Sequence, residues 1–443
     1  MGSASNAALT AARSHVALRR QLATTPGRLR LAAALLALSA IVFGVVAAHA
    51  AGERRHAVQS VDATEPLLVS AVKLSASLSN THAIAAFSFL RGRPEPAQSR
   101  RLYDEEMQQA SVGIAKLARE IGTSSGSGPA LRRISETMPV YAGLIENARA
   151  NNRQGFPVGS AYLRKASKTM RNGMLPAARD LYKIEAQNLT TGYRAGVSSW
   201  TMLAVVLAGC VMLMLLAWTQ MYLARATRRI FNPGLVVATA LLLGLVVWIV
   251  VAFTVQQSAL AEAQGKGSDP VELLTATRIL ASRAQADESI ALAARGGGEE
   301  EPRLHDVDRG FQAVTRPIGG LLDQAGAIAG DASAPIDAID RAYRTYLEAH
   351  SRVVKQVRHG DFTKAVELAV DRGADGSPST KNAGDALDDA LDREVGIAQG
   401  RFEDAAARAD SALDGLAGGI PALTGLCALL ALLGVRQRLE EYR

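Results

Sequence analysis

The residue types that usually carry out chemistry are scattered through this sequence and do not assemble a catalytic motif. The seven His residues are dispersed, and the only two cysteines, Cys210 and Cys427, both lie in apolar stretches. Neither the G-x-x-x-x-G-K-[ST] loop that binds phosphate nor the H-E-x-x-H motif that binds zinc occurs. We therefore predict a protein that is not an enzyme, with no catalytic residue, no metal site and no cofactor.

Two short clusters resemble chemical sites only in composition. His305 and Asp306 lie close to Asp308, but exposed charges at a helix start explain this cluster better than a metal site. Gly296 to Gly298 resemble a phosphate loop, yet Glu299 to Glu301 follow and would repel phosphate. We interpret this second segment as a turn.

A third group of polar residues interrupts the apolar face of the first long helix that we expect outside the membrane, and has a counterpart in the second half. Such residues, facing a bundle core, could contact a ligand or a partner. The alternatives are exposure to solvent or local pairing, as between Arg283 and Asp287 one helical turn apart. The candidates are Asn80, Thr81, His82, Asp287 and Glu288.

Four apolar stretches have the length that crosses a bilayer, about 20 residues for about 30 Å of hydrocarbon. We predict transmembrane helices at 31–50, 200–222, 234–254 and 414–435, the last becoming apolar at Leu416. No Asp, Glu, Lys or Arg lies inside these apolar stretches, which argues against an ion or proton pathway. The Ala48-His49-Ala50 pattern also fits a secretory signal, but the apolar run is long and begins late, so we expect a retained anchor.

Basic residues beside the spans predict the orientation, because cytoplasmic segments are enriched in Lys and Arg. The N-terminal segment carries five arginines without an acid, and the short loop after the second span is also purely basic. We expect a multi-pass protein of the cell membrane with both termini in the cytoplasm. The loop arginines are candidates for contact with a cytoplasmic partner or membrane lipid, or they only determine topology: Arg225, Arg228 and Arg229.

The predicted fold is an all-α membrane protein with four transmembrane helices and two tandem extracytoplasmic four-helix bundles. The bundles occupy 51–199 and 255–413, and the cytoplasmic parts are 1–30, 223–233 and 436–443. Ala, Leu, Arg and Glu dominate the outer segments, which favours helices. We expect these helices near 54–91, 98–121, 129–152, 158–199, 257–294, 302–327, 335–358 and 361–413, the last interrupted near 373–379.

The two halves read as copies of one unit. A shift of 204 residues aligns Thr64-Glu65-Pro66 with Ser268-Asp269-Pro270, and a shift of 205 aligns Tyr141 with Tyr346. The charges differ: 51–199 holds 20 Lys and Arg against 12 Asp and Glu, whereas 255–413 holds 18 against 27. The domains therefore pack against each other, within the chain or between chains, or meet different partners, unless their charges simply drifted apart after duplication.

The architecture resembles the sensor modules of bacterial chemoreceptors and histidine kinases, although their cytoplasmic signalling domains are missing. Three segments resemble a more specific family, the actinobacterial four-span membrane relay proteins of the glutamine-sensing pathway of protein kinase G. These segments are Thr25-Pro26-Gly27-Arg28-Leu29-Arg30, Thr64-Glu65-Pro66-Leu67-Leu68 and Phe89-Leu90-Arg91-Gly92.

This resemblance implies a relay that couples an extracytoplasmic glutamine-, glutamate- or aspartate-binding lipoprotein to a cytoplasmic Ser/Thr protein kinase. The cytoplasmic segments are too short to fold into an enzyme, so any output inside the cell must come from a partner. The alternatives are an envelope scaffold without enzyme activity, a stand-alone four-helix-bundle receptor and, last, a transporter subunit. A homo-oligomer stays among the alternatives, and we expect no nucleic acid among the partners.

Overall fold

The computed structural model describes residues 25–90, 95–121, 126–154, 158–227, 232–294, 304–330, 334–373 and 375–440. Some residues singled out above lie outside these ranges. They include Arg228, Arg229, Arg91, Gly92 and the glycine and glutamate run from Gly296 to Glu301.

The described part of the chain is helical and contains no β-strand, which confirms the predicted all-α class. Four of its long helices are apolar enough to cross a membrane. The helices are α2 (Thr25–Leu90), α3 (Ala97–Glu120), α4 (Gly128–Arg153), α5 (Val158–Thr169), α6 (Leu175–Gly196), α7 (Ser199–Thr227), α8 (Pro233–Glu262), α9 (Asp269–Ala294), α10 (Leu304–Ala329), α11 (Ala334–Arg358), α12 (Phe362–Val370), α13 (Thr380–Ser411) and α14 (Leu416–Glu440).

Two short π-helical segments interrupt the regular helices. Segment η1 (Met170–Met174) joins α5 to α6, and η2 (Ala263–Ser268) joins α8 to α9. Single π-helical turns often mark functional positions, because the extra residue displaces side chains from the regular helical face. In η2 the lack of a side chain at Gly267 is required, since a Cβ there would lie 2.7 Å from the Cβ of Phe402.

Local sequence explains where the later helices stop. Gly360, two residues after the end of α11, adopts a left-handed backbone with φ of 81°, a conformation that glycine adopts without strain. The Asp361 side chain then accepts a hydrogen bond from the Lys364 amide and caps α12. Since α12 ends at Val370 and α13 begins at Thr380, the predicted interruption near 373–379 is confirmed.

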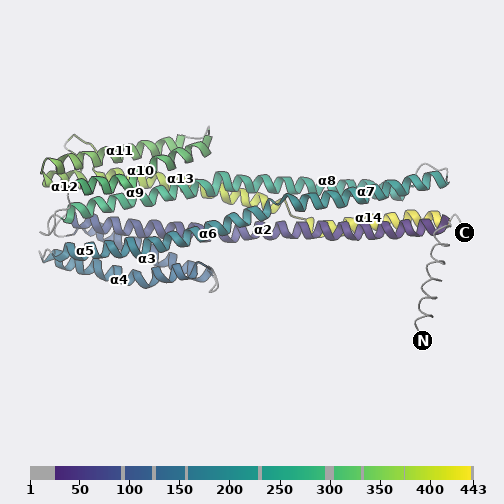
Figure 1. Cartoon of the computed structure of the whole chain (residues 1–443), viewed down its shortest axis with the longest axis horizontal. Helices are drawn as coiled ribbons and strands as arrows, with labels where there is room; N and C mark the ends of the chain where they lie inside the picture. Colours follow the sequence, from purple (N-terminus) through teal and green to yellow (C-terminus); the bar gives the residue numbers. More distant parts are fainter. Residues whose placement is uncertain are drawn as a thin grey trace, which may run out of the picture. The chain divides into compact units, whose positions relative to one another are not determined.

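The chain divides into two compact units. The membrane unit comprises Met1–Gln59, Gly192–Leu260 and Ala407–Arg443, and the bundle unit comprises Ser60–Thr191 and Ala261–Ala406. Helix α2 is continuous and contributes residues to both units (Figure 1).

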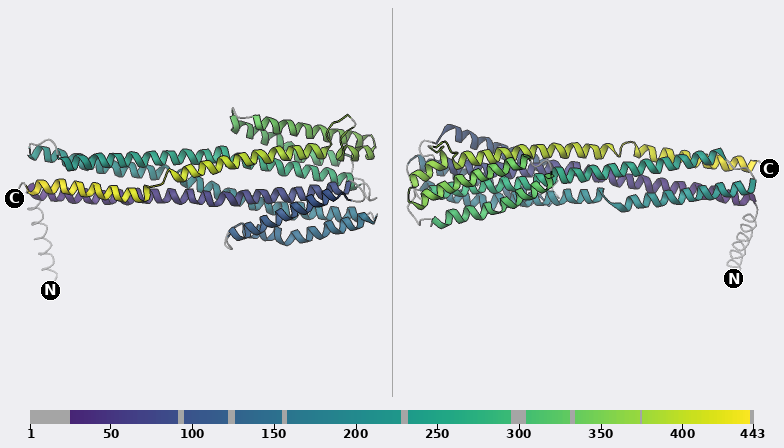
Figure 2. Two further views of the ribbon diagram at one scale, coloured as in Figure 1. Left: turned by 180° about the vertical axis from the view of Figure 1, so that it is seen from behind. Right: turned by 90° about the horizontal axis from the view of Figure 1, so that it is seen from above.

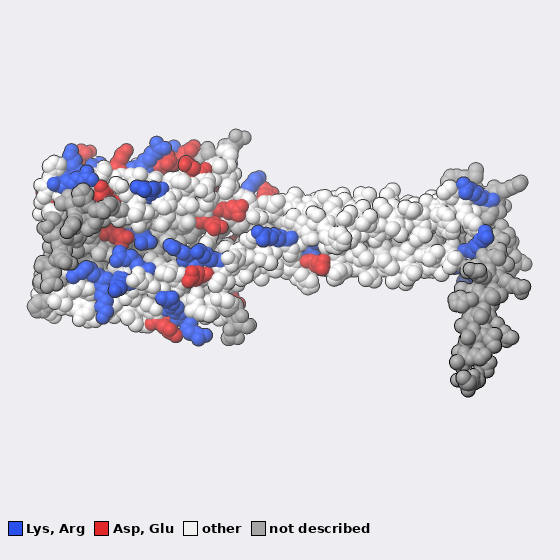
Figure 3. Space-filling model, in the orientation of Figure 1, with Lys and Arg blue, Asp and Glu red and all other residues white. Residues whose placement is uncertain are grey.

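The membrane unit packs its helices closely and keeps large apolar side chains on the outside. Gly419 of α14 lies against the Trp248 ring of α8, and a Cβ at this position would come within 2.6 Å of that ring. Ile41, Val45 and Met214 are each more than 60% exposed, as expected of side chains that face lipid. On the face shown in Figure 3, charged residues are sparse over these helices. This pattern identifies a multi-pass membrane protein, whereas the orientation and the exact segment boundaries stay predictions.

The bundle unit contains two helical bundles (Figure 2). Each has its own apolar core. The first bundle is formed by α2 from Ser60 onward, α3, α4 and the α5–η1–α6 segment, and Leu78, Ile134 and Tyr141 lie in its core. The second is formed by α9 to α13, with Phe311, Tyr346 and Leu387 in its core. The two are joined by α2 and α9, because Ile290 of α9 enters the first core and Phe87 of α2 packs on Leu292. The internal duplication stays a prediction.

Candidate functional site

Asn80 and Thr81 lie on α2 near the contact between the two bundles. The Ser282 hydroxyl of α9 donates a hydrogen bond to Asn80 Oδ1 over 3.0 Å, and Asn80 Nδ2 donates to Glu106 Oε1 over 3.4 Å. Thr81 is buried, and its hydroxyl donates to the Ser77 carbonyl of the same helix. Asn80 therefore connects the bundles, whereas the Thr81 hydroxyl is already bonded within its own helix.

His82 lies in the interior of the first bundle. Its two ring nitrogens are each 3.2 Å from a hydroxyl oxygen, that of Tyr141 on one side and that of Ser167 on the other. Burial, with a smaller contribution from the positive charge of Arg171, lowers the pKa of His82 to about 3. The imidazole is consequently neutral at physiological pH and links three helices of the bundle.

Asp287 forms a second polar connection between the bundles. Its carboxylate accepts a hydrogen bond from Arg171 Nη1 over 2.8 Å, and Arg283 Nε lies 3.7 Å from it. Because Arg171 belongs to η1 and Asp287 to α9, this ion pair joins a bundle of positive net charge to one of negative net charge. Such complementarity favours packing of the two bundles within the chain.

Glu288 has a different environment from its neighbour. It is buried in the second bundle, and its Oε1 lies 3.2 Å from His350 Nδ1. The Nε2 atom of the same imidazole lies 3.9 Å from Asp308. Glu288 therefore belongs to the interior of the second bundle, while Asp287 belongs to the contact between bundles.

The remaining predicted contacts are the loop arginines after the second span. Arg225 is exposed in the last turn of α7. Arg228 and Arg229 lie outside the described residues. Arg225 is thus sterically available to a partner or to lipid.

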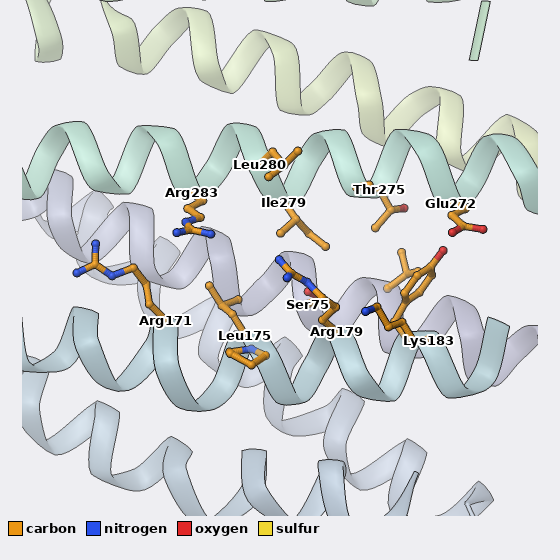
Figure 4. A pocket seen from close by; sticks show the side chains of 14 residues that line it. Ser75, Arg171, Leu175, Arg179, Lys183, Glu272, Thr275, Ile279, Leu280 and Arg283 are labelled. Carbon is orange, nitrogen blue, oxygen red and sulfur yellow. The ribbon is translucent and has the colours of Figure 1, made fainter. Parts of the chain in front are cut away.

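A cavity of about 360 Å³ lies between the bundles, bounded by α2, the η1–α6 segment and α9 (Figure 4). Most of its lining is apolar, and Ser75 and Thr275 add hydroxyl groups. Small-molecule sites commonly combine such an apolar wall with a few convergent polar groups. The lining residues are Val72, Ser75, Arg171, Leu175, Pro176, Arg179, Tyr182, Lys183, Glu272, Thr275, Ala276, Ile279, Leu280 and Arg283.

The charged groups around this cavity are mostly cationic and come from both bundles. Arg171, Arg179 and Lys183 lie on the η1–α6 side, and Arg283 faces them from α9 (Figure 4). Glu272 supplies the single carboxylate of the lining. Among the described residues, Arg179 and Lys183 form no ion pair, so no described carboxylate neutralises their charge.

Tyr182 contributes a hydroxyl at the Glu272 end of the cavity. Burial, and then the negative charge of Glu272, raises the pKa of Tyr182 above its usual range. The phenol therefore stays protonated at all physiological pH values and can donate a hydrogen bond.

The cavity charges were not singled out by sequence reasoning, although a signal for them exists. Arg171, Arg179 and Lys183 are separated by eight and four residues, a spacing that places them along one face of a helix. The sequence alone did not show that this basic face meets α9, because that contact joins residues about 100 positions apart. Of the candidates, Asp287 and Asn80 lie in the same contact, whereas His82 and Glu288 lie inside separate bundles.

Within the described residues, no group of three or more His, Cys, Asp or Glu side chains is arranged to hold a metal ion.

Residues 56–194 match the family model of the actinobacterial sensor domain. This segment contains the first bundle and its side of the cavity. No characterised protein and no solved structure matches the chain. The family match and the helical membrane architecture together indicate a non-catalytic sensor with a role in sensing or signalling.

Proposed function

We propose that this protein is a transmembrane signal relay, which detects an extracytoplasmic signal with its bundle unit and changes the activity of a cytoplasmic partner. One observation carries the proposal. The segment that matches a sensor domain meets the second bundle at a contact containing two polar connections and a basic cavity. A contact that is polar and incompletely packed can be rearranged at lower cost than an apolar core.

The proposed partners follow from the resemblance and from the charges near the spans. Outside, we propose a lipoprotein that binds glutamine, glutamate or aspartate and docks on the bundles. Inside, we propose a Ser/Thr protein kinase, contacted by the basic loop that begins after α7.

A stand-alone receptor is the second candidate function, and the cavity is the specific observation that favours it. In that case the small molecule binds directly between the bundles without a carrier protein. The two functions share the same membrane topology and differ in the first extracytoplasmic step.

The relay is tested by purifying the full chain from its native membrane with glutamate, glutamine or aspartate and without them. We expect an extracytoplasmic binding protein and a cytoplasmic kinase to co-purify, in amounts that change with the amino acid. Mass spectrometry identifies both. Recovery of neither protein, or of cell-wall proteins unaffected by amino acids, would contradict the relay and favour the scaffold.

A further inference from the structure

We infer that the cavity between the bundles is a direct binding site for a small dicarboxylate, with an aliphatic body against the apolar wall and carboxylates on the basic groups. This inference rests on the proposed sensing function and names the chemical class of ligand at its contact site. The cavity volume, about 360 Å³, accommodates a molecule of this size but excludes a folded domain.

Charge selects the class of ligand. Arg171, Arg179, Lys183 and Arg283 line the cavity, and Glu272 is the one carboxylate among the described lining residues. Two further carboxylates lie nearby, because Asp287 pairs with Arg171 and Asp269 acts on Tyr182. The lining itself therefore carries more positive than negative groups, which favours an anionic ligand. Arg side chains bind carboxylates with paired N–H donors, so two arginines on opposite walls suit a ligand with a carboxylate at each end.

The positions of the cations explain how such a ligand would act. Arg179 reaches into the cavity from α6, while Arg283 reaches into it from α9 (Figure 4). A dicarboxylate held by both would therefore bridge the two bundles. Binding energy would then depend on the distance between the bundles, which is the requirement for a ligand to shift a conformational equilibrium.

Asp287 competes with the ligand in this arrangement. It accepts a hydrogen bond from Arg171 and lies near Arg283, so it withdraws both cations from an incoming carboxylate. Removing the negative charge of Asp287 should thus increase affinity, whereas removing the charge of Arg179 should decrease it. Misfolding cannot explain opposite effects at the same cavity.

The test is isothermal titration calorimetry of the purified full chain in detergent, with succinate, glutarate and glutamate as ligands. We expect saturable binding that Arg179→Gln weakens by about tenfold, the usual effect of one charge-assisted hydrogen bond. Asp287→Asn should tighten binding several-fold. Arg164→Gln serves as the matched control, because Arg164 is exposed on α5 outside the cavity, and should leave affinity unchanged.

The inference is overturned if none of the three ligands binds, or if binding is the same in Arg179→Gln and wild type. It is also overturned if inorganic phosphate binds and the dicarboxylates do not. This binding experiment and the co-purification experiment that tests the relay can fail independently. If partners co-purify in an amino-acid-dependent way but no dicarboxylate binds, the relay is retained and this site is excluded. If a dicarboxylate binds but no partner co-purifies, the site is retained and the relay is excluded.

Discussion

Glu65 on α2 is a carboxyl group whose ionisation is set by its surroundings. It is buried in the bundle unit, and burial, followed by the negative charges of Glu403 and Asp62, raises its pKa from 4.5 to about 7. The folded state therefore holds the proton more tightly than the unfolded chain does. Stability from this group is fully present below about pH 4.5 and is lost as the pH rises through about 7.

Glu65→Gln should remove this dependence, because glutamine stays neutral. At pH 8 we expect the variant to exceed wild type in free energy of unfolding by on the order of 2 kcal/mol, and at pH 4.5 to equal it. Hydrogen exchange of the α2 peptides in the full chain measures the difference. The exposed Glu105 of α3 provides the control, since Glu105→Gln should leave the pH profile unchanged. Parallel profiles for wild type and Glu65→Gln would contradict the assignment.

At this scale the sequence predicted which polar residues were unusual but not what they contact. Asn80, Thr81 and His82 were selected because they interrupt an apolar face, and the structure gives each a different partner. Arg179 was missed because the basic helix face that it forms with Arg171 and Lys183 has the spacing of an ordinary solvated surface. Only the approach of α9 makes its charge informative.

At the scale of elements, Arg54 is the buried charge that connects helices of the membrane unit. Its guanidinium donates to Gln256 Oε1 over 2.7 Å, to the Ser198 carbonyl and to the Thr201 hydroxyl. It also lies 4.2 Å from the centre of the Phe253 ring. Within the described chain no carboxylate pairs with it. Neutral dipoles and an aromatic face thus compensate the desolvated charge.

Loss of an acceptor should therefore cost more than loss of the arginine. Gln256→Leu leaves the Arg54 charge buried with one partner fewer, and we expect the free energy of unfolding to fall by about 3 kcal/mol. Arg54→Met leaves only neutral acceptors unpaired, and we expect a fall of about 1 kcal/mol. Tryptophan fluorescence during denaturation in detergent reports on this unit alone, because Trp200, Trp218 and Trp248 all belong to it.

The double variant with both substitutions completes the thermodynamic cycle. Its loss in free energy of unfolding should be smaller than the sum of the losses in the two single variants. The reason is that the double variant lacks the Arg54 charge, which Gln256→Leu alone leaves buried with one partner fewer. Additive losses, or a larger loss for Arg54→Met than for Gln256→Leu, would show that Arg54 acts through packing of its aliphatic stem instead.

The sequence predicted the helical class, the apolar helices and most helix boundaries of the whole molecule. Long stretches of Ala, Leu and charged residues bounded by Gly and Pro allow few other interpretations, as the interruption between α12 and α13 shows. The π-helical segments were not predicted, because the same residues suit a regular helix. The contact between α2 and α9 was left open, since its polar groups pair across a large sequence separation.

That contact allows a test of whether the two bundles must move relative to each other for signalling. In a chain with Cys210 and Cys427 replaced by alanine, Asn80→Cys and Ser282→Cys place thiols at positions whose native side chains are 3.0 Å apart. Closing the pair with copper phenanthroline, or with a short bifunctional maleimide, should abolish the amino-acid-dependent change in kinase co-purification. A ligand can act only by shifting an equilibrium between two arrangements of the bundles, and the cross-link leaves one arrangement available.

The matched control is a cross-link within one bundle. Arg100 of α3 and Glu146 of α4 form an ion pair at 2.9 Å in the first bundle, so Arg100→Cys with Glu146→Cys restrains helices that the relay does not require to separate. This pair should preserve the amino-acid response, and reduction should restore the response of the Asn80 and Ser282 disulfide. If the disulfide between bundles leaves the response intact, the proposed relay does not depend on relative movement of the bundles, and the proposed signal would have to pass through the membrane helices alone.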